Sequence, residues 1–423
     1  MAPTDFARPL STGGFKHGSC GNVTNTGDDQ LICRLVSLQV QDITSNVTLP
    51  VTTITIVRPP VILVHGLWGS FHDWDNFNPL VKSPSALDSR FSIDRFDYSY
   101  KVGATISNPS PAYQTVANAT ASSLGFQYNA PALYMEIVKW ISSFKLGRNS
   151  PTNIAVAAVQ ADIVAHSMGG DITRTMALSP TFLNDPNQPT FGKGIVHKLI
   201  TIDTPHLGSP LAHLLLLATN ACTRGKLAGS SFYSFTSVTL QAGNNSTCGT
   251  TTSPVANSTC GGVGDIDPAS ISLAAINSAP QPQPYYFPTA LIAGIYTNFA
   301  SLNCGGLCSA NMLRSSQKYG CPNDPLAQSL TQTGWPANFA PDTQNDAIVP
   351  LGSQLDMSPN PSPNAGIQRT GFVHSTGTEN LSFTRPSMLD PDVVGSQTSV
   401  PQTVINLLNT PVTNQTVFSP VNP

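Results

Sequence analysis

Charged residues are scarce in this chain of 423 residues. Asp, Glu, Lys and Arg together make up 10% of the sequence, and the formal net charge is −3. An average soluble protein carries roughly 25% charged residues. So weak and so balanced a charge excludes the basic surface that nucleic acids or anionic membranes attract. We therefore expect no nucleic-acid partner.

Long apolar runs are missing as well. No stretch of 18 apolar residues occurs, so the sequence predicts no transmembrane segment. The first residues, Met-Ala-Pro-Thr-Asp, have neither the basic region nor the apolar region of a signal peptide. We interpret the chain as a mature form without its signal peptide.

The sequence also lacks cysteine pairs with the spacing of a zinc site, so it predicts no metal ligand. The eight cysteines are Cys20, Cys33, Cys222, Cys248, Cys260, Cys304, Cys308 and Cys321. An even number in a charge-poor chain favours disulfides, an oxidising compartment and a secreted, extracellular protein. Free buried thiols are the alternative for some of them. Cys20 with Cys33 is the easiest local pair to close.

Regular alternation of apolar and polar residues begins near the N-terminus. Residues 36–40 and 47–56 alternate as half-buried antiparallel strands do. Arg58-Pro59-Pro60 ends this pattern, and Val61-Ile-Leu-Val64 follows as an uninterrupted apolar run. Such a run is typical of a strand that is buried on both faces.

Strands and helices then alternate along the chain. Further strands are predicted at 92–98, 161–165, 196–202, 290–296, 347–351 and 367–373. Helices are predicted at 71–81, 131–146, 168–178 and 401–408. This order favours an α/β fold with a mostly parallel, doubly wound sheet. Two segments, at about 207–285 and 297–340, interrupt it, and each carries three cysteines. We interpret them as insertions that form a cap or lid.

The segment Ala165-His-Ser-Met-Gly-Gly170 lies between a predicted strand and a predicted helix. A nucleophilic serine must project from a sharp turn, which needs small residues two positions before and two after it. Ala165 and Gly169 meet this requirement around Ser167. The helix that begins at Met168 would direct its free N–H groups toward a developing negative charge.

His65-Gly66-Leu67-Trp68-Gly69 directly follows the first buried strand. A loop in this place supplies a backbone N–H to an oxyanion hole. We expect the Leu67 N–H and the Met168 N–H to form that hole. His65 is interpreted as a residue that shapes the loop and transfers no proton.

A serine nucleophile on this type of fold is followed in the chain by an acid and then by a histidine. His374 is the only histidine after the predicted strand at 290–296, so it is the candidate base. Asp346 is the preferred acid, with Asp342, Asp324 and Asp356 as alternatives. In this arrangement His374 takes the Ser167 proton, and Asp346 fixes the histidine tautomer.

These motifs together resemble the lipase and esterase branch of the α/β-hydrolases. The sequence is similar to bacterial triacylglycerol lipases and to the lipase-like GPI-inositol deacylases. The segments that carry the resemblance, beside the two already quoted, are Thr204-Pro-His-Leu-Gly-Ser209, Gly264-Asp-Ile-Asp-Pro-Ala-Ser270 and Asn345-Asp-Ala-Ile-Val349.

The resemblance spans roughly residues 60–410 and implies the α/β-hydrolase fold. Residues 58–423 would then form the catalytic domain with its two insertions, and residues 1–57 an N-terminal extension with the first antiparallel strands. Lipases of this type often hold a structural calcium ion. No carboxylate pair here assigns such a site. The sequence therefore assigns no cofactor and no metal ligand, and a structural calcium ion stays an open alternative.

The predicted function is a secreted carboxylic-ester hydrolase, an esterase or lipase that works through an acyl-enzyme. Its substrates would be small-molecule, lipid or polymer esters, polyesters included, and the protein would be a monomer. Apolar residues near the reacting centre suit an acyl group, and we expect Trp68, Leu207 and Leu211 to contact it. The same triad would serve an amidase, a thioesterase or an acyltransferase. A non-catalytic binding module is the alternative from another class.

Overall fold

The computed structural model describes about half of the chain, including most of the predicted strands and helices. The described residues are 21–22, 33–81, 88, 90–99, 122, 124–146, 158–179, 182–183, 185, 190, 192–216, 261–277, 287–296, 339, 342, 344–357, 360–361, 366–375 and 386–418.

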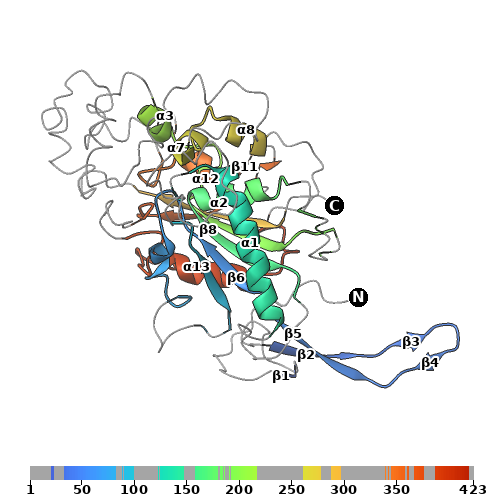
Figure 1. Ribbon diagram of the computed structural model, residues 1–423. Coiled ribbons are helices and arrows are strands. Elements are labelled where there is room, and N and C mark those ends of the chain that lie inside the picture. The colour runs from blue at the N-terminus through green and yellow to red at the C-terminus, as the bar shows by residue number, and fades with distance from the viewer. Residues whose placement is uncertain are drawn as a thin grey trace, which may run out of the picture.

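Six parallel strands form the central sheet (Figure 1). Their order across the sheet is β13-β10-β9-β8-β6-β7, and every neighbouring pair is parallel. In chain order the strands are β6 (Val61–Val64), β7 (Ile93–Phe96), β8 (Ala161–His166), β9 (Val196–Ile202), β10 (Thr289–Ile295) and β13 (Ile367–Thr370). The predicted parallel α/β sheet is therefore confirmed.

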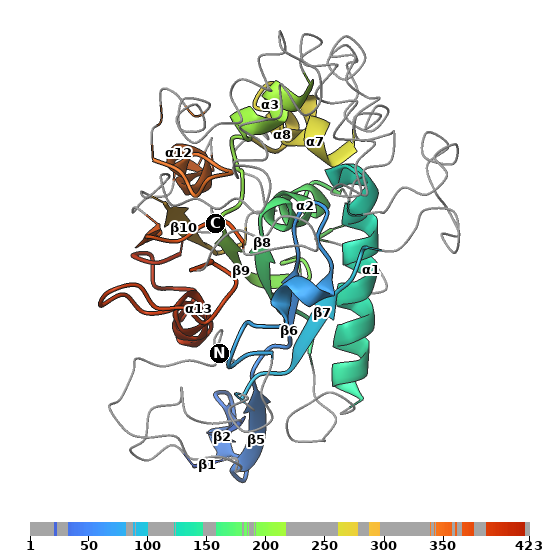
Figure 2. The same ribbon diagram turned by 90° about the vertical axis from the view of Figure 1, so that its left-hand side faces the viewer.

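Helices cover both faces of this sheet (Figure 2). One face packs against α1 (Phe126–Lys145) and α2 (Met168–Met176), and the other against the short 3₁₀ helix η2 (Phe71–Trp74) and α13 (Val400–Asn409). Ile163 of β8 belongs to the first core and Ile200 of β9 to the second, and both are fully buried. Burial of each such side chain stabilises the fold by about 1.5–3 kcal/mol. The sheet is thus doubly wound, as the alternating pattern predicts.

The helix α1 begins five residues before the predicted start at 131, because a distant carboxylate caps it. The Phe126 N–H at its first turn donates a hydrogen bond to Asp265 Oδ2 at 2.7 Å. An acceptor at this place satisfies one of the N–H groups that a helix N-terminus leaves without an intrahelical partner. Asp265 lies 139 positions further along the chain, so no local pattern could show this start.

Two of the predicted elements are wrong. The helix expected over 71–81 is confined to η2. Pro79 excludes its last part, because it lacks an N–H and disfavours helical geometry in the residue before it. The strand expected over 347–351 is a set of bends followed by α12 (Leu351–Leu355). The Asp346 side chain captures the N–H groups of Ile348 and Val349 there, and such local bonds compete with a strand ladder.

The N-terminal strands form an arm apart from the central sheet (Figure 1). Antiparallel pairing of β2 (Cys33–Leu38) with β5 (Thr52–Val57) confirms the predicted pair, and β1 (Gly21–Asn22) lies beside β2. Beyond them β3 (Gln41–Asp42) pairs with β4 (Val47–Thr48) near the turn. The strands were expected to bury their apolar face, which is wrong near the turn. Four apolar residues there are 51–57% exposed, namely Val40, Val47, Leu49 and Val51.

The described part of the first insertion lies beyond the end of the sheet at which α2 begins (Figures 1 and 2). It comprises α3 (Pro210–Leu216), α7 (Gly261–Asp265) and α8 (Ile271–Asn277). A short hairpin, β11 (Asp356–Met357) with β12 (Asn360–Pro361), follows α12. The cysteine side chains lie outside the described part of the chain, so the disulfides stay predictions. No helix among the described residues has the length and apolar character that crossing a membrane requires.

Candidate active site

Ser167 stands in the sharp turn between β8 and α2. Its backbone is in the left-handed region, with φ +54°, a conformation that is costly for a residue with a side chain. The turn is held by the Ser167 N–H, which donates to the Ile202 carbonyl of β9 at 2.9 Å. A Cβ at Gly169 would lie 2.7 Å from the carbonyl oxygens of Val64 and His65. The second small residue of the motif is therefore required by the approach of α2 to the end of β6.

The loop after β6 lies beside this turn. In the described part of the chain, neither the Leu67 N–H nor the Met168 N–H donates to a backbone carbonyl. An oxyanion hole requires N–H groups that are available in this way. Gly262 of α7 packs against both residues: a Cβ there would lie 2.4 Å from Leu67 Cδ1 and 2.9 Å from Met168 Sδ. The helix α7 thus contacts the two residues that were predicted to stabilise the oxyanion.

His65 fixes this loop from beneath, which agrees with its interpretation as a shaping residue. Its ring stacks on Tyr98, with 3.8 Å between the ring centroids. Its Nε2 accepts a hydrogen bond from the Tyr98 N–H at 3.3 Å, so the proton sits on Nδ1, which contacts the Gly66 carbonyl at 3.0 Å. Burial lowers the pKa of His65 to about 4. The residue is therefore neutral and held as part of the loop.

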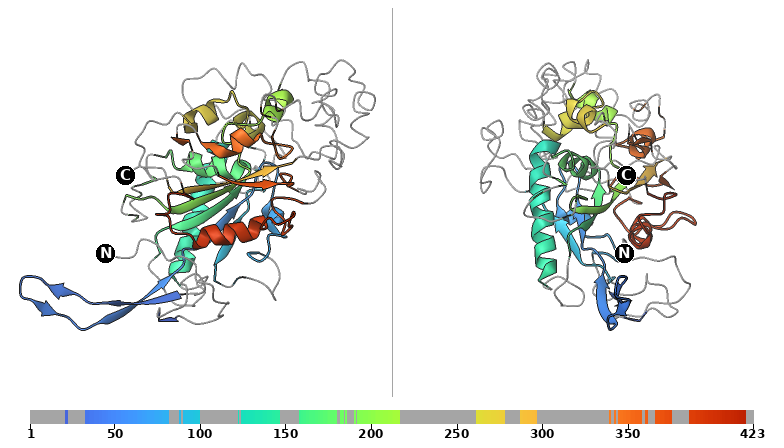
Figure 3. Two further views of the ribbon diagram at one scale, coloured as in Figure 1. Left: turned by 180° about the vertical axis from the view of Figure 1, so that it is seen from behind. Right: turned by 90° about the vertical axis from the view of Figure 1, so that its right-hand side faces the viewer.

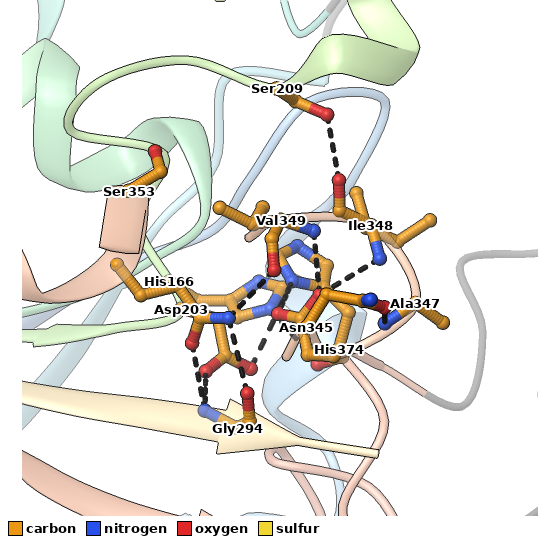
Figure 4. Close-up of polar contacts among 12 residues, drawn as sticks. His166, Asp203, Ser209, Gly294, Asn345, Ala347, Ile348, Val349, Ser353 and His374 are labelled. Carbon is orange, nitrogen blue, oxygen red and sulfur yellow. Dashed lines mark hydrogen bonds and ion pairs between the residues drawn. The ribbon is translucent and has the colours of Figure 1, made fainter. Parts of the chain in front are cut away.

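The structure brings the candidate acid and base together (Figure 4). His374 Nδ1 donates to Asp346 Oδ2 at 2.7 Å, and the His374 N–H donates to the Asp346 carbonyl at 3.0 Å. The other carboxylate oxygen, Asp346 Oδ1, accepts from the N–H groups of Ile348 at 2.8 Å and Val349 at 2.7 Å. With its proton on Nδ1, His374 keeps a lone pair on Nε2 with which it can accept a proton.

His166 links the serine turn to this pair. It precedes Ser167 directly, and its Nε2 donates to the His374 carbonyl at 3.2 Å. The two imidazole rings lie 4.6 Å apart between centroids. Burial, and next to it the charge of His374, holds the pKa of His166 well below its usual value. A neutral His166 therefore brings β8 and the His374 loop together, a contact that sequence reasoning missed.

Asp203 is a second residue that sequence reasoning missed. It follows β9 directly and is fully buried. Its Oδ1 accepts from the Gly294 N–H at 2.7 Å, and its Oδ2 lies 3.8 Å from His374 Nδ1 (Figure 4). Burial and the neighbouring Asp346 raise the pKa of Asp203 well above its usual value. Its position directly after a predicted strand could have identified it, because functional residues gather at the carboxyl ends of parallel strands.

The Thr204–Ser209 segment fastens the acid loop to the rest of the site. Ser209 Oγ donates to the Ile348 carbonyl at 2.6 Å (Figure 4). Ser353 Oγ donates to the Gly208 carbonyl at 2.7 Å. His206 is fully buried, with Nδ1 3.2 Å from an Arg174 guanidinium nitrogen and Nε2 3.3 Å from Thr201 Oγ1. It therefore orders its loop by hydrogen bonds.

The other predicted residues lie around this centre. Trp68 is half-buried, has a positive φ of +58° and packs against the core under α1. The Leu207 N–H donates to Ser353 Oγ at 3.0 Å, and Leu211 lies half-buried on α3. Of the alternative acids, Asp342 Oδ2 accepts from the Gly352 N–H at 2.6 Å and Asp356 lies in β11. Asp324 lies outside the described residues.

Three ligand atoms from His166, Asp203 and His374 lie within 4.8 Å of one another, close enough to be considered for a metal ion. All three groups already have hydrogen-bond partners: His374 pairs with Asp346, His166 with the His374 carbonyl, and Asp203 with the Gly294 N–H. We therefore interpret the cluster as a hydrogen-bonded acid–base site.

One family model matches part of the chain. Residues 60–245 match the family described as "Putative serine esterase (DUF676)". This stretch contains the loop after β6 and the serine turn, and it ends before Asp346 and His374. No curated protein matches the sequence significantly.

Similar solved structures include bacterial lipases and esterases of low sequence identity. The mature lipase BlEst2 of Bacillus licheniformis is 15% identical, with a TM-score of 0.37 over 75% of this chain and 85% of that one. The Staphylococcus hyicus lipase is 15% identical, with a TM-score of 0.39 over 82% of this chain and 93% of that one. EstA of Clostridium botulinum is 15% identical, with a TM-score of 0.38 over 83% of this chain and 86% of that one.

Proposed function

We propose that this chain, an α/β-hydrolase of the lipase and esterase branch and a serine carboxylic-ester hydrolase, cleaves esters of apolar acyl groups through an acyl-enzyme on Ser167. The single observation that carries the proposal is the place of Ser167. It stands in a strained turn at the N-terminus of α2, and the residue before it contacts His374, the partner of Asp346.

The catalytic cycle follows from this arrangement. Ser167 Oγ attacks the ester carbonyl carbon while His374 Nε2 takes the hydroxyl proton. The carbonyl oxygen becomes an oxyanion, which the Leu67 and Met168 N–H groups stabilise. The tetrahedral intermediate collapses, His374 returns the proton to the leaving alcohol, and the acyl group stays on Ser167. Water, deprotonated by His374, then attacks the acyl-enzyme and releases the carboxylic acid.

Apolar side chains around the oxyanion residues support an acyl substrate. Leu67, Trp68 and Met168 all belong to or pack against the apolar core beneath α1 and α2. Such a wall favours an alkyl or aryl group over a charged one. Lipid and polyester substrates belong to the proposal, with Leu207 and Leu211 as further contacts. Secretion, disulfides and a monomeric state are also part of it; the even number of cysteines supports the first two.

Hydrolysis of p-nitrophenyl esters of increasing acyl length tests the reaction and its preference. Ser167→Ala should lower kcat/KM by about 10⁴-fold or more and abolish labelling by an active fluorophosphonate. Ser142→Ala is the matched control, because Ser142 lies on α1 and its hydroxyl donates to the Val138 carbonyl of the same helix. Ester hydrolysis that persists in purified Ser167→Ala would refute the assignment. Matched ester, amide and thioester substrates separate the esterase from the other acyl-transfer activities.

A further inference from the structure

Two neighbouring strands of the sheet end in the same unusual way. β8 is followed by Ser167 with φ +54°, and β9 is followed by Asp203 with φ +53°. Each backbone N–H donates at 2.9 Å to the strand beside it, Ser167 to Ile202 and Asp203 to Ile292. Strained residues of this kind persist where the surrounding structure holds them, and they gather at functional sites. Asp203 thus has the same backbone setting as the nucleophile, one strand away.

The Asp203 side chain faces the acid–base pair. Its Oδ2 lies 3.8 Å from His374 Nδ1, the atom that Asp346 Oδ2 accepts from at 2.7 Å. Gly294 makes room for both carboxyl groups, since a Cβ there would lie 3.1 Å from Asp346 Cβ and 3.2 Å from Asp203 Oδ1. His374 therefore has two carboxyl groups on its Nδ1 side, one bonded and one adjacent.

The hydrogen bonds show which carboxyl carries the charge. Asp346 accepts from two backbone N–H groups and from His374, whereas Asp203 accepts from the Gly294 N–H alone, which Gln354 Oε1 shares. None of the described residues donates a hydrogen bond to Asp203 Oδ2. Ionisation of one buried carboxyl disfavours ionisation of a carboxyl beside it, and the one with more hydrogen-bond donors is favoured as the anion. Asp203 is the one that keeps a proton.

We propose that Asp203 is a positioning residue of the triad: a neutral carboxylic acid beside Asp346 that becomes the acid partner of His374 when Asp346 is removed. This inference rests on the proposed function of the site. Besides Asp346 and Asp203, the titratable group that contacts His374 among the described residues is His166 at the end of β8, whose other titratable neighbour there is His65. Both of these histidines are buried and neutral, so the charge on the Nδ1 side is that of Asp346.

A double-mutant cycle tests the reserve role. Asp203→Asn should lower kcat/KM by roughly threefold and Asp346→Asn by roughly 10–100-fold. Together they should approach the roughly 10⁴-fold loss that follows removal of the acid from a serine triad. Asp162→Asn is the matched control, because Asp162 is a buried aspartate that pairs with a histidine, His197, at 2.7 Å near the start of β8. It should leave kcat/KM unchanged in either background.

The pH profile and infrared spectrum test the protonation. Because Asn mimics a neutral carboxyl, Asp203→Asn should leave the acid limb of the kcat/KM profile in place. A shift of the limb to lower pH by about one unit would show that Asp203 is charged in the wild type and would overturn the proposal. Difference infrared spectra, wild type minus Asp203→Asn, should contain the carbonyl stretch of a protonated acid. The absence of this band would also overturn it.

Failure of the inference is distinguishable from failure of the proposed function. If Asp346→Asn and the double variant are equally active while Ser167→Ala is inactive, the function stands and the reserve role of Asp203 is wrong. If Ser167→Ala keeps its ester hydrolysis, the function is wrong, and the infrared band still decides whether Asp203 carries a proton. Should the double variant fail to fold, Asp346→Ser with and without Asp203→Asn replaces it.

Discussion

The carboxyl end of the sheet and the N-terminal arm are built in opposite ways. At the carboxyl end, Trp68, Ser167, Asp203 and Ala347 all have positive φ angles, and the titratable groups among and beside them are buried. The arm has one such angle, at Asn46 in its turn, and apolar side chains that remain half exposed. The two regions lie at opposite ends of the molecule (Figure 3).

The two regions make different demands on the stability of the fold. Strained backbones and buried ionisable groups oppose folding, so the packed sheet must hold them, and it does so at the proposed active site. Exposed valines and leucines on a paired hairpin reduce the stability of the fold little, because they bury no polar group. Substitutions at the carboxyl end should therefore change catalysis, while equivalent ones on the arm should leave it intact.

The largest effect is expected at the base. His374→Ala removes the group that accepts the Ser167 proton, so kcat/KM for a p-nitrophenyl ester should fall by about 10⁴-fold or more. His72→Ala, at a side chain 61% exposed on η2, should remain within about twofold of the wild type. Equal activity of the two variants would show that the carboxyl end is not the catalytic centre.

A smaller loss is expected from Gly66→Ala. The new Cβ would lie 2.6 Å from Ser167 Cβ and 3.0 Å from its Oγ, so the loop and the nucleophile must separate. Loss of one oxyanion donor lowers kcat by about 10²–10³-fold, and we expect an effect of that size with a nearly unchanged KM. Gly192→Ala is the control, with φ +75° and no atom within 4 Å of the new Cβ. It should destabilise the fold by about 1–2 kcal/mol and spare kcat.

A third prediction concerns stability and pH. Burial lowers the pKa of His65 from 6.5 to about 4. Between these values the unfolded chain binds more protons at this residue than the folded chain, so the free energy of unfolding falls as the pH falls. His65→Gln should lose less stability than the wild type between about pH 7 and pH 4, by up to about 3 kcal/mol. Denaturant unfolding at several pH values measures this. The same loss in both proteins would contradict a neutral, buried His65, and exposed His72→Gln serves as the control.

The smallest effect is expected on the arm. Val47 is 54% exposed, so Val47→Thr should change the free energy of unfolding by less than about 0.5 kcal/mol and kcat/KM by less than about twofold. Val164→Thr makes the same replacement of a methyl by a hydroxyl group at a fully buried site in β8. It should cost about 1–3 kcal/mol, because the new hydroxyl is desolvated. Similar losses in the two variants, measured by thermal unfolding, would remove the distinction between arm and sheet.

The sequence predicted those features that depend on neighbours in the chain. The apolar run at 196–202 coincides with β9, and the small residues around Ser167 indicate the turn, because strand and turn signals are local. The cap of Asp265 on α1 and the contact of Asp203 with His374 join residues 139 and 171 positions apart, so no pattern in either segment contains them.

Alternation along residues 47–51 likewise shows that one face of a strand is apolar, but it does not show whether anything covers that face. The strand expected at 347–351 fails for a related reason. Its apolar residues suit a ladder, yet the Asp346 side chain satisfies the local N–H groups instead. Hydrophobic pattern alone does not record that competition.

The position of the arm has a practical consequence for immobilised enzyme. Its turn, residues 43–46 between β3 and β4, lies far from the end of the sheet at which α2 begins (Figure 1). Ile43 in this turn is 93% exposed, so a single coupling handle placed there would be accessible to a resin or an electrode. Attachment at this point would orient every molecule alike, with the end of the sheet that carries Ser167 on the side away from the support.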